Sequence, residues 1–130
     1  MKRFVLSLLL FSLIGIAFAV RVELQDARTI ALNAYFQKLN TYYEKVNFSD
    51  LEIVNHFVIS QNGESVVYAF NFANYGSILI AAEDAIEPIL GYTFESQYSS
   101  EEQPENFRGL IWEYGDHIQY LRNNKIEAWL

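Results

Sequence analysis

Cysteine is absent from this 130-residue chain. Without a thiol the chain cannot be a cysteine protease, and no disulfide can stabilise it, so the domain depends on its hydrophobic core. Ten phenylalanines, nine tyrosines and two tryptophans supply large side chains for that core. Histidine is also scarce: His56 and His117 lie far apart and lack metal-ligand spacing. We therefore expect structural histidines, no metal site and no cofactor.

Basic residues are in the minority, with nine Lys and Arg against sixteen Asp and Glu, for a net charge of −7. An acidic domain without a basic stripe binds nucleic acid and anionic membranes poorly. The carboxylates Glu83, Asp84 and Glu87 cluster, but they lack the regular spacing of a calcium loop, and we expect a solvated turn there. No nucleophile or phosphate-binding motif is present, so the sequence predicts a protein that is not an enzyme.

A long apolar run occurs at the very start of the chain. Lys2 and Arg3 precede an almost unbroken apolar stretch, residues 4–14, and Ala17 and Ala19 then supply small residues at the two positions that a signal peptidase reads. This three-part pattern is typical of a secretory signal, and the run is shorter than the roughly 20 apolar residues of a membrane span. We expect cleavage after Ala19 and export to the periplasm or the cell exterior. Loss of the two cations would move the net charge of the remaining domain, residues 20–130, from −7 to −9.

Helical and strand patterns alternate along the rest of the chain. Residues 24–44 predict a helix whose polar side chains occupy one narrow arc, and the wide apolar remainder favours a deeply seated helix over one that also touches a partner. Four strands are expected at residues 51–60, 65–73, 77–82 and 89–95. Asn62-Gly63 predicts a tight hairpin turn, and the short connections favour antiparallel neighbours. On the second strand, Val66 should share a face with the large aromatic residues.

A second helix is expected after a polar, acidic loop at residues 97–105. It begins near Pro104 or Asn106 and extends to about Asn124. Its apolar side chains follow helical spacing, as Phe107, Leu110, Ile111, Tyr114, Ile118 and Leu121. The predicted fold class is therefore α+β: one domain, with a four-stranded antiparallel sheet flanked by an N-terminal and a C-terminal helix.

Residues 67–92 carry a resemblance to a known family. Asn74-Tyr75-Gly76, the apolar strand after it and Pro88-Ile89-Leu90-Gly91-Tyr92 occur in this order, and Pro104-Glu105-Asn106-Phe107 then opens the last helix. The chain resembles the propeptide of the streptopain family of cysteine proteases, and equally the free-standing streptopain inhibitors that are built like it. Ser77 departs from the pattern, in which a large residue often follows the glycine. Because the chain stops at Leu130, the resemblance favours the inhibitor branch.

The resemblance implies both a partner and a site. Members of the family cover the active site of a streptopain-like cysteine protease with the start of the last helix. By position in the motif, Asn106 matches the asparagine that enters the active site and displaces the catalytic histidine. The implied protease-binding residues are Asn106, Glu105, Phe107, Pro104 and Glu102. A simpler role for Asn106 is that of a helix N-cap, for which asparagine is well suited.

Two other functions stay open at this point. The domain can be a non-inhibitory adhesive or carbohydrate-binding module that uses surface Tyr and Trp. It can also be a detached pro-domain that assists the folding of a separately made protease. In each case we expect the free domain to be a monomer, with no membrane contact after the signal is removed.

Overall fold

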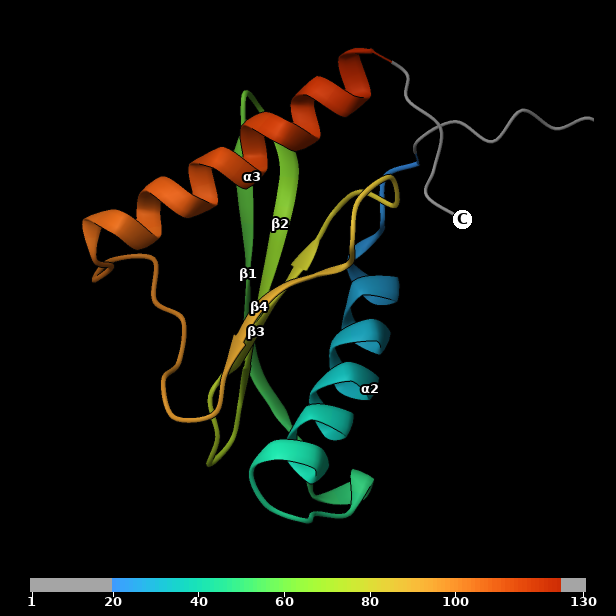
Figure 1. The fold of residues 1–130 in the computed structure, drawn as a ribbon, viewed down its shortest axis with the longest axis vertical. Helices are drawn as coiled ribbons and strands as arrows, with labels where there is room; N and C mark the ends of the chain where they lie inside the picture. The colour runs from blue at the N-terminus through green and yellow to red at the C-terminus, as the bar shows by residue number, and fades with distance from the viewer. Residues whose placement is uncertain (1–19, 125–130) are drawn as a thin grey trace, which may run out of the picture.

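The computed structural model describes residues 20–124 and shows a sheet with one helix on each face (Figure 1). The elements are α2 (Leu24–Tyr42), the 3-10 helix η1 (Phe48–Asp50), β1 (Ile53–Gln61), β2 (Glu64–Phe72), β3 (Ser77–Ala81), β4 (Ile89–Thr93) and α3 (Glu105–Asn123). The strands are antiparallel and lie in the order β1-β2-β3-β4. The predicted α+β fold is confirmed. The expected signal, residues 1–19, lies outside the described residues.

The two tight turns of the sheet depend on residues that adopt a positive φ. Asn62 and Gly63 connect β1 to β2 with φ angles of 53° and 78°. Asn74 lies between β2 and β3 with a φ of 64°. Asparagine and glycine tolerate this left-handed conformation better than other residues do, which explains their presence at both turns. No helix within residues 20–124 is long and apolar enough to span a bilayer.

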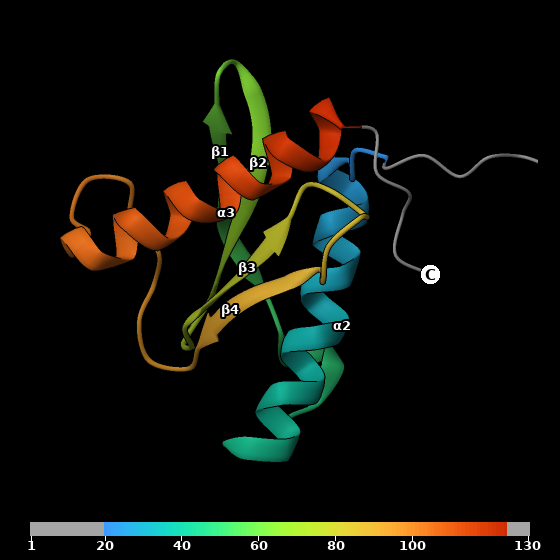
Figure 2. The same cartoon turned by 45° about the horizontal axis from the view of Figure 1, so that its top comes forward.

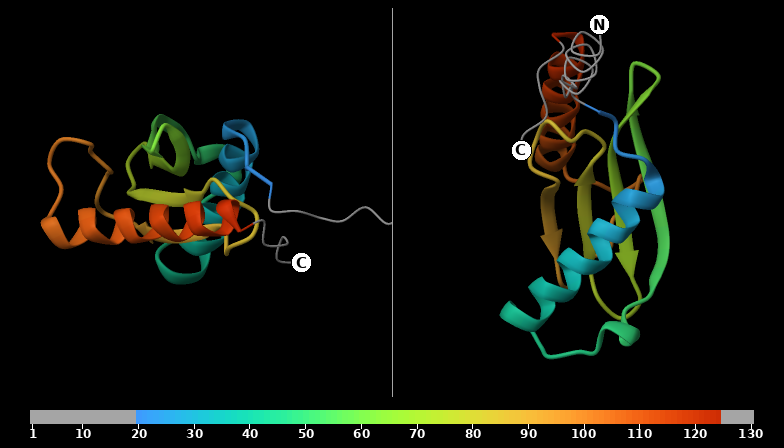
Figure 3. Two further views of the ribbon diagram at one scale, coloured as in Figure 1. Left: turned by 90° about the horizontal axis from the view of Figure 1, so that it is seen from above. Right: turned by 90° about the vertical axis from the view of Figure 1, so that its right-hand side faces the viewer.

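Helix α2 crosses one face of the sheet (Figure 3). Its buried side chains form a single stripe. The buried side chains recur every fourth residue, at Ala27, Ala31, Tyr35 and Leu39. The alanines are small enough to let the helix approach the strands closely. The other apolar side chains of α2 are only partly covered, and Tyr42 is 65 % exposed. The expectation of a deeply seated helix is therefore wrong, because the sheet covers one side of α2 only.

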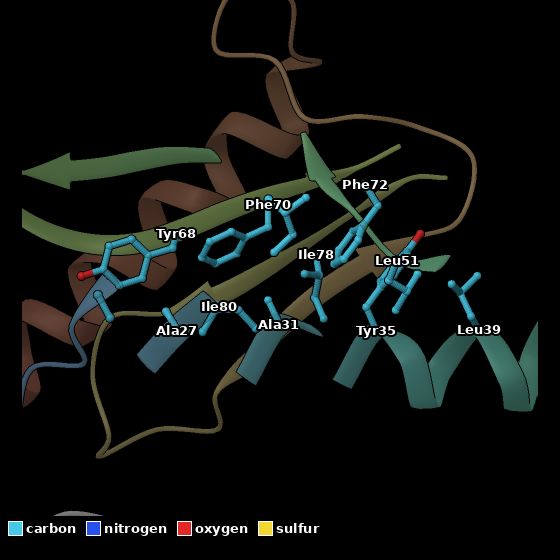
Figure 4. Packing of buried hydrophobic residues seen from close by; sticks show 12 residues of the cluster. Ala27, Ala31, Tyr35, Leu39, Leu51, Tyr68, Phe70, Phe72, Ile78 and Ile80 are labelled. Atoms are coloured by element: carbon cyan, nitrogen blue, oxygen red, sulfur yellow. The ribbon is translucent and has the colours of Figure 1, made fainter. Parts of the chain in front are cut away.

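The core on the α2 face is continuous (Figure 4). Tyr35 stacks on Phe72 with ring centroids 4.1 Å apart and an interplanar angle of 6°. Its buried hydroxyl donates to the Thr93 carbonyl oxygen at 2.9 Å and accepts the Gly76 N–H at 2.9 Å, so it links β4 to the β2–β3 turn. Burial raises the pKa of Tyr35 to about 12. The large side chains of β2 on this face are Tyr68, Phe70 and Phe72.

The other face of the sheet carries smaller side chains and packs against α3. Val67 and Ala69 of β2 contact the buried stripe of α3, which includes Ile111 and Ile118. Val66 joins this cluster instead of the aromatic face to which its place in the strand assigned it. The cause is a β-bulge: Ile59 pairs with Val67 and Ser60 with Ser65, which leaves Val66 as the extra residue.

The C-terminal end of α3 is held by an ion pair that the sequence did not reveal. Glu83, expected in a solvated turn, is buried, with 1 % of its side chain exposed. Its Oε2 accepts from Nε of Arg122 at 2.8 Å, and Arg122 also donates to the carbonyl oxygens of Ser65 and Ala82. Burial raises the pKa of Glu83 even though Arg122 opposes the shift. The expectation of a solvated turn is wrong because the partner of Glu83 lies on a distant helix.

Candidate functional site

Helix α3 leaves part of its own face of the sheet uncovered. It packs on β1 and β2, and beside it a hollow of about 500 Å³ lies over β3 and β4. Strand register defines the floor: Ser77 pairs with Thr93, and Leu79 pairs with Gly91. The connection from β4 to α3 and the start of α3 form the walls. Figure 2 shows this connection as a wide loop that leaves β4 and returns to the N-terminal end of α3.

Asn71 on β2 fixes this loop to the sheet. Its side chain is buried, its Nδ2 donates to Asn55 Oδ1 at 2.8 Å and to the Tyr98 carbonyl oxygen at 2.9 Å, and its Oδ1 accepts the Tyr98 N–H at 2.7 Å. Gln97 adds a bond from Nε2 to the Phe72 carbonyl oxygen. All hydrogen-bonding groups of the Asn71 carboxamide that face the loop are therefore used. The loop has a defined path despite its polar sequence.

Three aromatic rings connect the loop to the start of α3. Tyr98 lies between Phe57 of β1, at a centroid distance of 5.1 Å, and Phe107 of α3, at 6.3 Å. Tyr98 and Phe107 also line the hollow. On β4, Leu90 is the extra residue of a second bulge, and its carbonyl oxygen accepts from the Tyr114 hydroxyl at 3.2 Å. The first turns of α3 are thus positioned by packing against the loop and the edge strand.

Asn106 lies in the first turn of α3 and is exposed. The N-cap is Pro104, whose carbonyl oxygen accepts the N–H groups of Phe107 and Arg108 at 3.1 Å each. The N-cap role considered for Asn106 is therefore not what the structure shows. Its Oδ1 accepts only the adjacent Phe107 N–H, at 2.9 Å, among the described residues. The carboxamide is free to meet other groups.

The structure brings most of the predicted site residues together. Glu102, Pro104, Asn106 and Phe107 all line the hollow. Glu105 is exposed at the first position of α3, outside that lining. Sequence reasoning missed Asn71, Tyr98 and Gly91; a polar residue in the apolar β2 strand was the available signal for Asn71. Leu110, expected on the buried stripe, is 42 % exposed and borders the hollow.

The two histidines take no part in this site. His56 is exposed on β1, its ring 6.2 Å from that of Phe70, and His117 is exposed on α3. Within residues 20–124, no cluster of three or more His, Asp or Glu side chains has a geometry that could hold a metal ion. The chemistry offered by the hollow is that of a binding surface: a free carboxamide, apolar walls and an acidic rim.

Comparison with family models gives the class: the Spi protease inhibitor family matches residues 19–118, which include the whole sheet and most of α3. The chain belongs to the Spi protease inhibitor family. It is an inhibitor and not an enzyme, and membership implies inhibition of a streptopain-like cysteine protease. Comparison with curated proteins and with solved structures gives no significant match.

Proposed function

We propose that this domain inhibits its cysteine protease by inserting the start of α3 into the active-site cleft, with Asn106 at the catalytic centre. The observation that carries the proposal is the position of Asn106: it is exposed, in the first turn of a helix whose other end is firmly packed. Four of the five residues assigned by family resemblance line one hollow at this place. They form one surface, as a contact with a single partner requires.

The chemistry of a carboxamide suits this role. Asn106 Nδ2 offers two donors and Oδ1 retains acceptor capacity, so the side chain can satisfy the hydrogen-bonding groups of a cysteine–histidine pair. The side-chain amide is not a peptide bond of the main chain, so attack by the nucleophile would not cleave the inhibitor chain. Displacement of the histidine would remove the base that keeps the cysteine a thiolate, and the enzyme would stay inactive while bound.

The test is the inhibition constant of Asn106→Ala and Asn106→Asp against a streptopain-like protease, measured with a peptide substrate. We expect both changes to raise the constant about tenfold or more, which corresponds to a loss of about 1.4 kcal/mol or above. Asp keeps the size of the side chain and is favourable in the first turn of a helix, so the melting temperature should not fall. If both variants inhibit like the parent protein, another residue blocks the enzyme.

Export of the domain is part of the proposal. The sequence pattern before residue 20 supports cleavage after Ala19, and Val20 itself is bonded to the folded domain. The Val20 N–H donates to Asp84 Oδ1 at 2.6 Å, and the Val22 N–H donates to the Ala82 carbonyl oxygen at 3.1 Å. Cleavage would leave these contacts in place and put an ammonium group beside the Asp84 carboxylate. The intact mass of the exported protein tests this: a mass that still contains residues 1–19 would contradict it.

A further inference from the structure

Gly91 leaves the floor of the hollow without a side chain. A Cβ atom added at this position would meet nothing within 4 Å. The φ angle of Gly91 is not in the left-handed region, so its backbone does not require glycine either. Gly76 is different, since a Cβ there would lie 2.0 Å from the Thr93 carbonyl oxygen. At Gly91 neither backbone geometry nor close packing explains the missing side chain, and its visible effect is to keep the hollow open.

The walls around this open floor are largely apolar. Leu79 and Leu90 border Gly91 within the sheet, and Tyr98, Phe107 and Leu110 close the hollow from the loop and α3. Leu110 is 42 % exposed although it lies on the same helix as a well-buried stripe. Binding pockets commonly have volumes of about 300 to 1,000 Å³, and this one holds about 500 Å³. The space is large enough for a bulky apolar side chain.

We propose that the hollow receives an apolar side chain from the rim of the target protease's active-site cleft while Asn106 enters that cleft. This inference rests on the proposed function. Asn106 and Phe107 line the hollow themselves, so a partner that contacts Asn106 also lies over Gly91 and Leu110. A large side chain seated in a partner's pocket is the usual form of a strong contact at a protein interface.

Charge at the rim defines the occupant further. Residues 95–110 contain Glu95, Glu101, Glu102 and Glu105 against a single cation, Arg108. Glu102 lines the hollow, and Glu95, Glu101 and Glu105 are exposed. Opposite charge at an interface rim favours encounter, and like charge opposes it. The protease side chain that fills the hollow is therefore apolar, with basic residues beside it on the rim of the cleft.

Filling the floor of the hollow tests the inference. We expect Gly91→Leu to raise the inhibition constant at least tenfold, because its side chain occupies the space that the protease needs. Gly91→Ala adds one methyl group and should change the constant less than threefold. Neither change should lower the melting temperature, since glycine weakens a strand interior and nothing opposes the new Cβ. Ser60→Leu is the matched control: it adds similar bulk at an exposed position of β1, the opposite edge strand, and should leave inhibition unchanged.

The outcomes separate this inference from the proposed function. In one outcome the parent protein inhibits, Asn106→Ala weakens inhibition, and Gly91→Leu inhibits as strongly as the parent. The hollow is then empty in the complex, which overturns this inference and leaves the proposed function standing. If the parent protein does not inhibit at all, the proposed function itself fails. Should Gly91→Leu unfold, Leu110→Ala decides: weaker inhibition at an unchanged melting temperature supports the inference, and unchanged inhibition overturns it. A dimer of the parent protein that Gly91→Leu dissociates would also overturn it, because a second copy would then fill the hollow.

Discussion

The two faces of the sheet differ in how completely they are covered. On the α2 face, twelve buried residues form one cluster, whose members run along the chain from Ala27 to Ala82. The hydroxyl of Tyr35, one of these residues, donates to the Thr93 carbonyl oxygen of β4. On the α3 face the buried cluster has seven members, which come from β2, β3 and α3, and the hollow beside Asn106 lies over the part of β3 and β4 that α3 does not cover. One face stabilises the fold, and the incomplete face carries the binding surface that we propose. A small domain can separate the two tasks because one sheet has two sides.

The same division occurs within α3. From Ile111 onward, the residues that face the sheet are buried at Ile111, Gly115, Ile118 and Leu121, and Arg122 is bonded to Glu83. Among the first six residues of the helix only Phe107 is even partly covered. Gly115 marks the tightest contact, since a Cβ there would lie 1.9 Å from Gln61 Oε1. The packed end holds the helix, and the exposed end carries the residues that we propose contact the protease.

Removal of one apolar side chain from each face should give the largest difference in the free energy of unfolding. Phe70→Ala on the closed face should lower the free energy of unfolding by about 3–5 kcal/mol, because Phe70 is fully buried and a cavity remains. Leu110→Ala on the open face should change it by less than about 0.5 kcal/mol. Urea denaturation of both variants measures the difference. Equal losses would mean that Leu110 is part of the stabilising core.

Alkaline pH provides a second test of the closed face. The pKa of Tyr35 is about 12 in the folded protein against 10.0 ordinarily, so the unfolded chain loses this proton first as the pH rises. Stability from this group is complete below pH 10 and is lost between pH 10 and 12, by about 2–3 kcal/mol in total.

The matched variant for this test is Tyr35→Phe, which keeps the ring and removes the proton. At pH 8 the parent protein should be the more stable of the two, because the variant lacks two hydrogen bonds. That advantage should shrink by about 2 kcal/mol as the pH approaches 12, since only the parent titrates at this position. A pH-independent difference between the two denaturation curves would show that Tyr35 ionises as readily in the folded protein as in the unfolded chain.

A smaller effect on stability is expected at Asn71, which fixes the loop beside the hollow. Asn71→Ala removes three hydrogen bonds, two of which fix Tyr98, and should cost about 1–3 kcal/mol of stability. It should also weaken inhibition, because the wall of the hollow is released. Asn55→Ala removes one of these bonds at an exposed position and is the milder control. Amide exchange at Tyr98 is the direct readout; unchanged protection in Asn71→Ala would contradict the assigned role.

Local patterns in the sequence predict the elements of this fold well. Strand alternation, the Asn62-Gly63 turn and the periodic apolar residues of α3 each depend on neighbours close in sequence, and the structure confirms the strands, the turn and the helix that they predict. Family resemblance, and not periodicity, predicted that Asn106 and Phe107 share one surface. A resemblance carries information on residue roles that the periodicity of a single chain does not contain.

Features that depend on distant residues were not predictable in the same way. Burial of Glu83 requires its ion-pair partner Arg122, which lies 39 positions away, and no residue near Glu83 in the sequence indicates this partner. Leu110 fits the same helical spacing as Ile111 and Ile118, but it borders the hollow and is 42 % exposed, and periodicity does not show where the packing of a helix on a sheet stops. The bulge that turns Val66 to the other face is likewise a property of two strands together.

The order of the strands has a consequence for the speed of folding. Every strand pairs with its neighbour in sequence, so each pairing closes a short loop and no crossover must form first. Proteins with such local contacts cross the folding barrier faster than those with distant pairings. A meander with a helix at each end can therefore assemble by itself and early. For an inhibitor this is an advantage in timing, because its binding surface exists before the enzyme arrives.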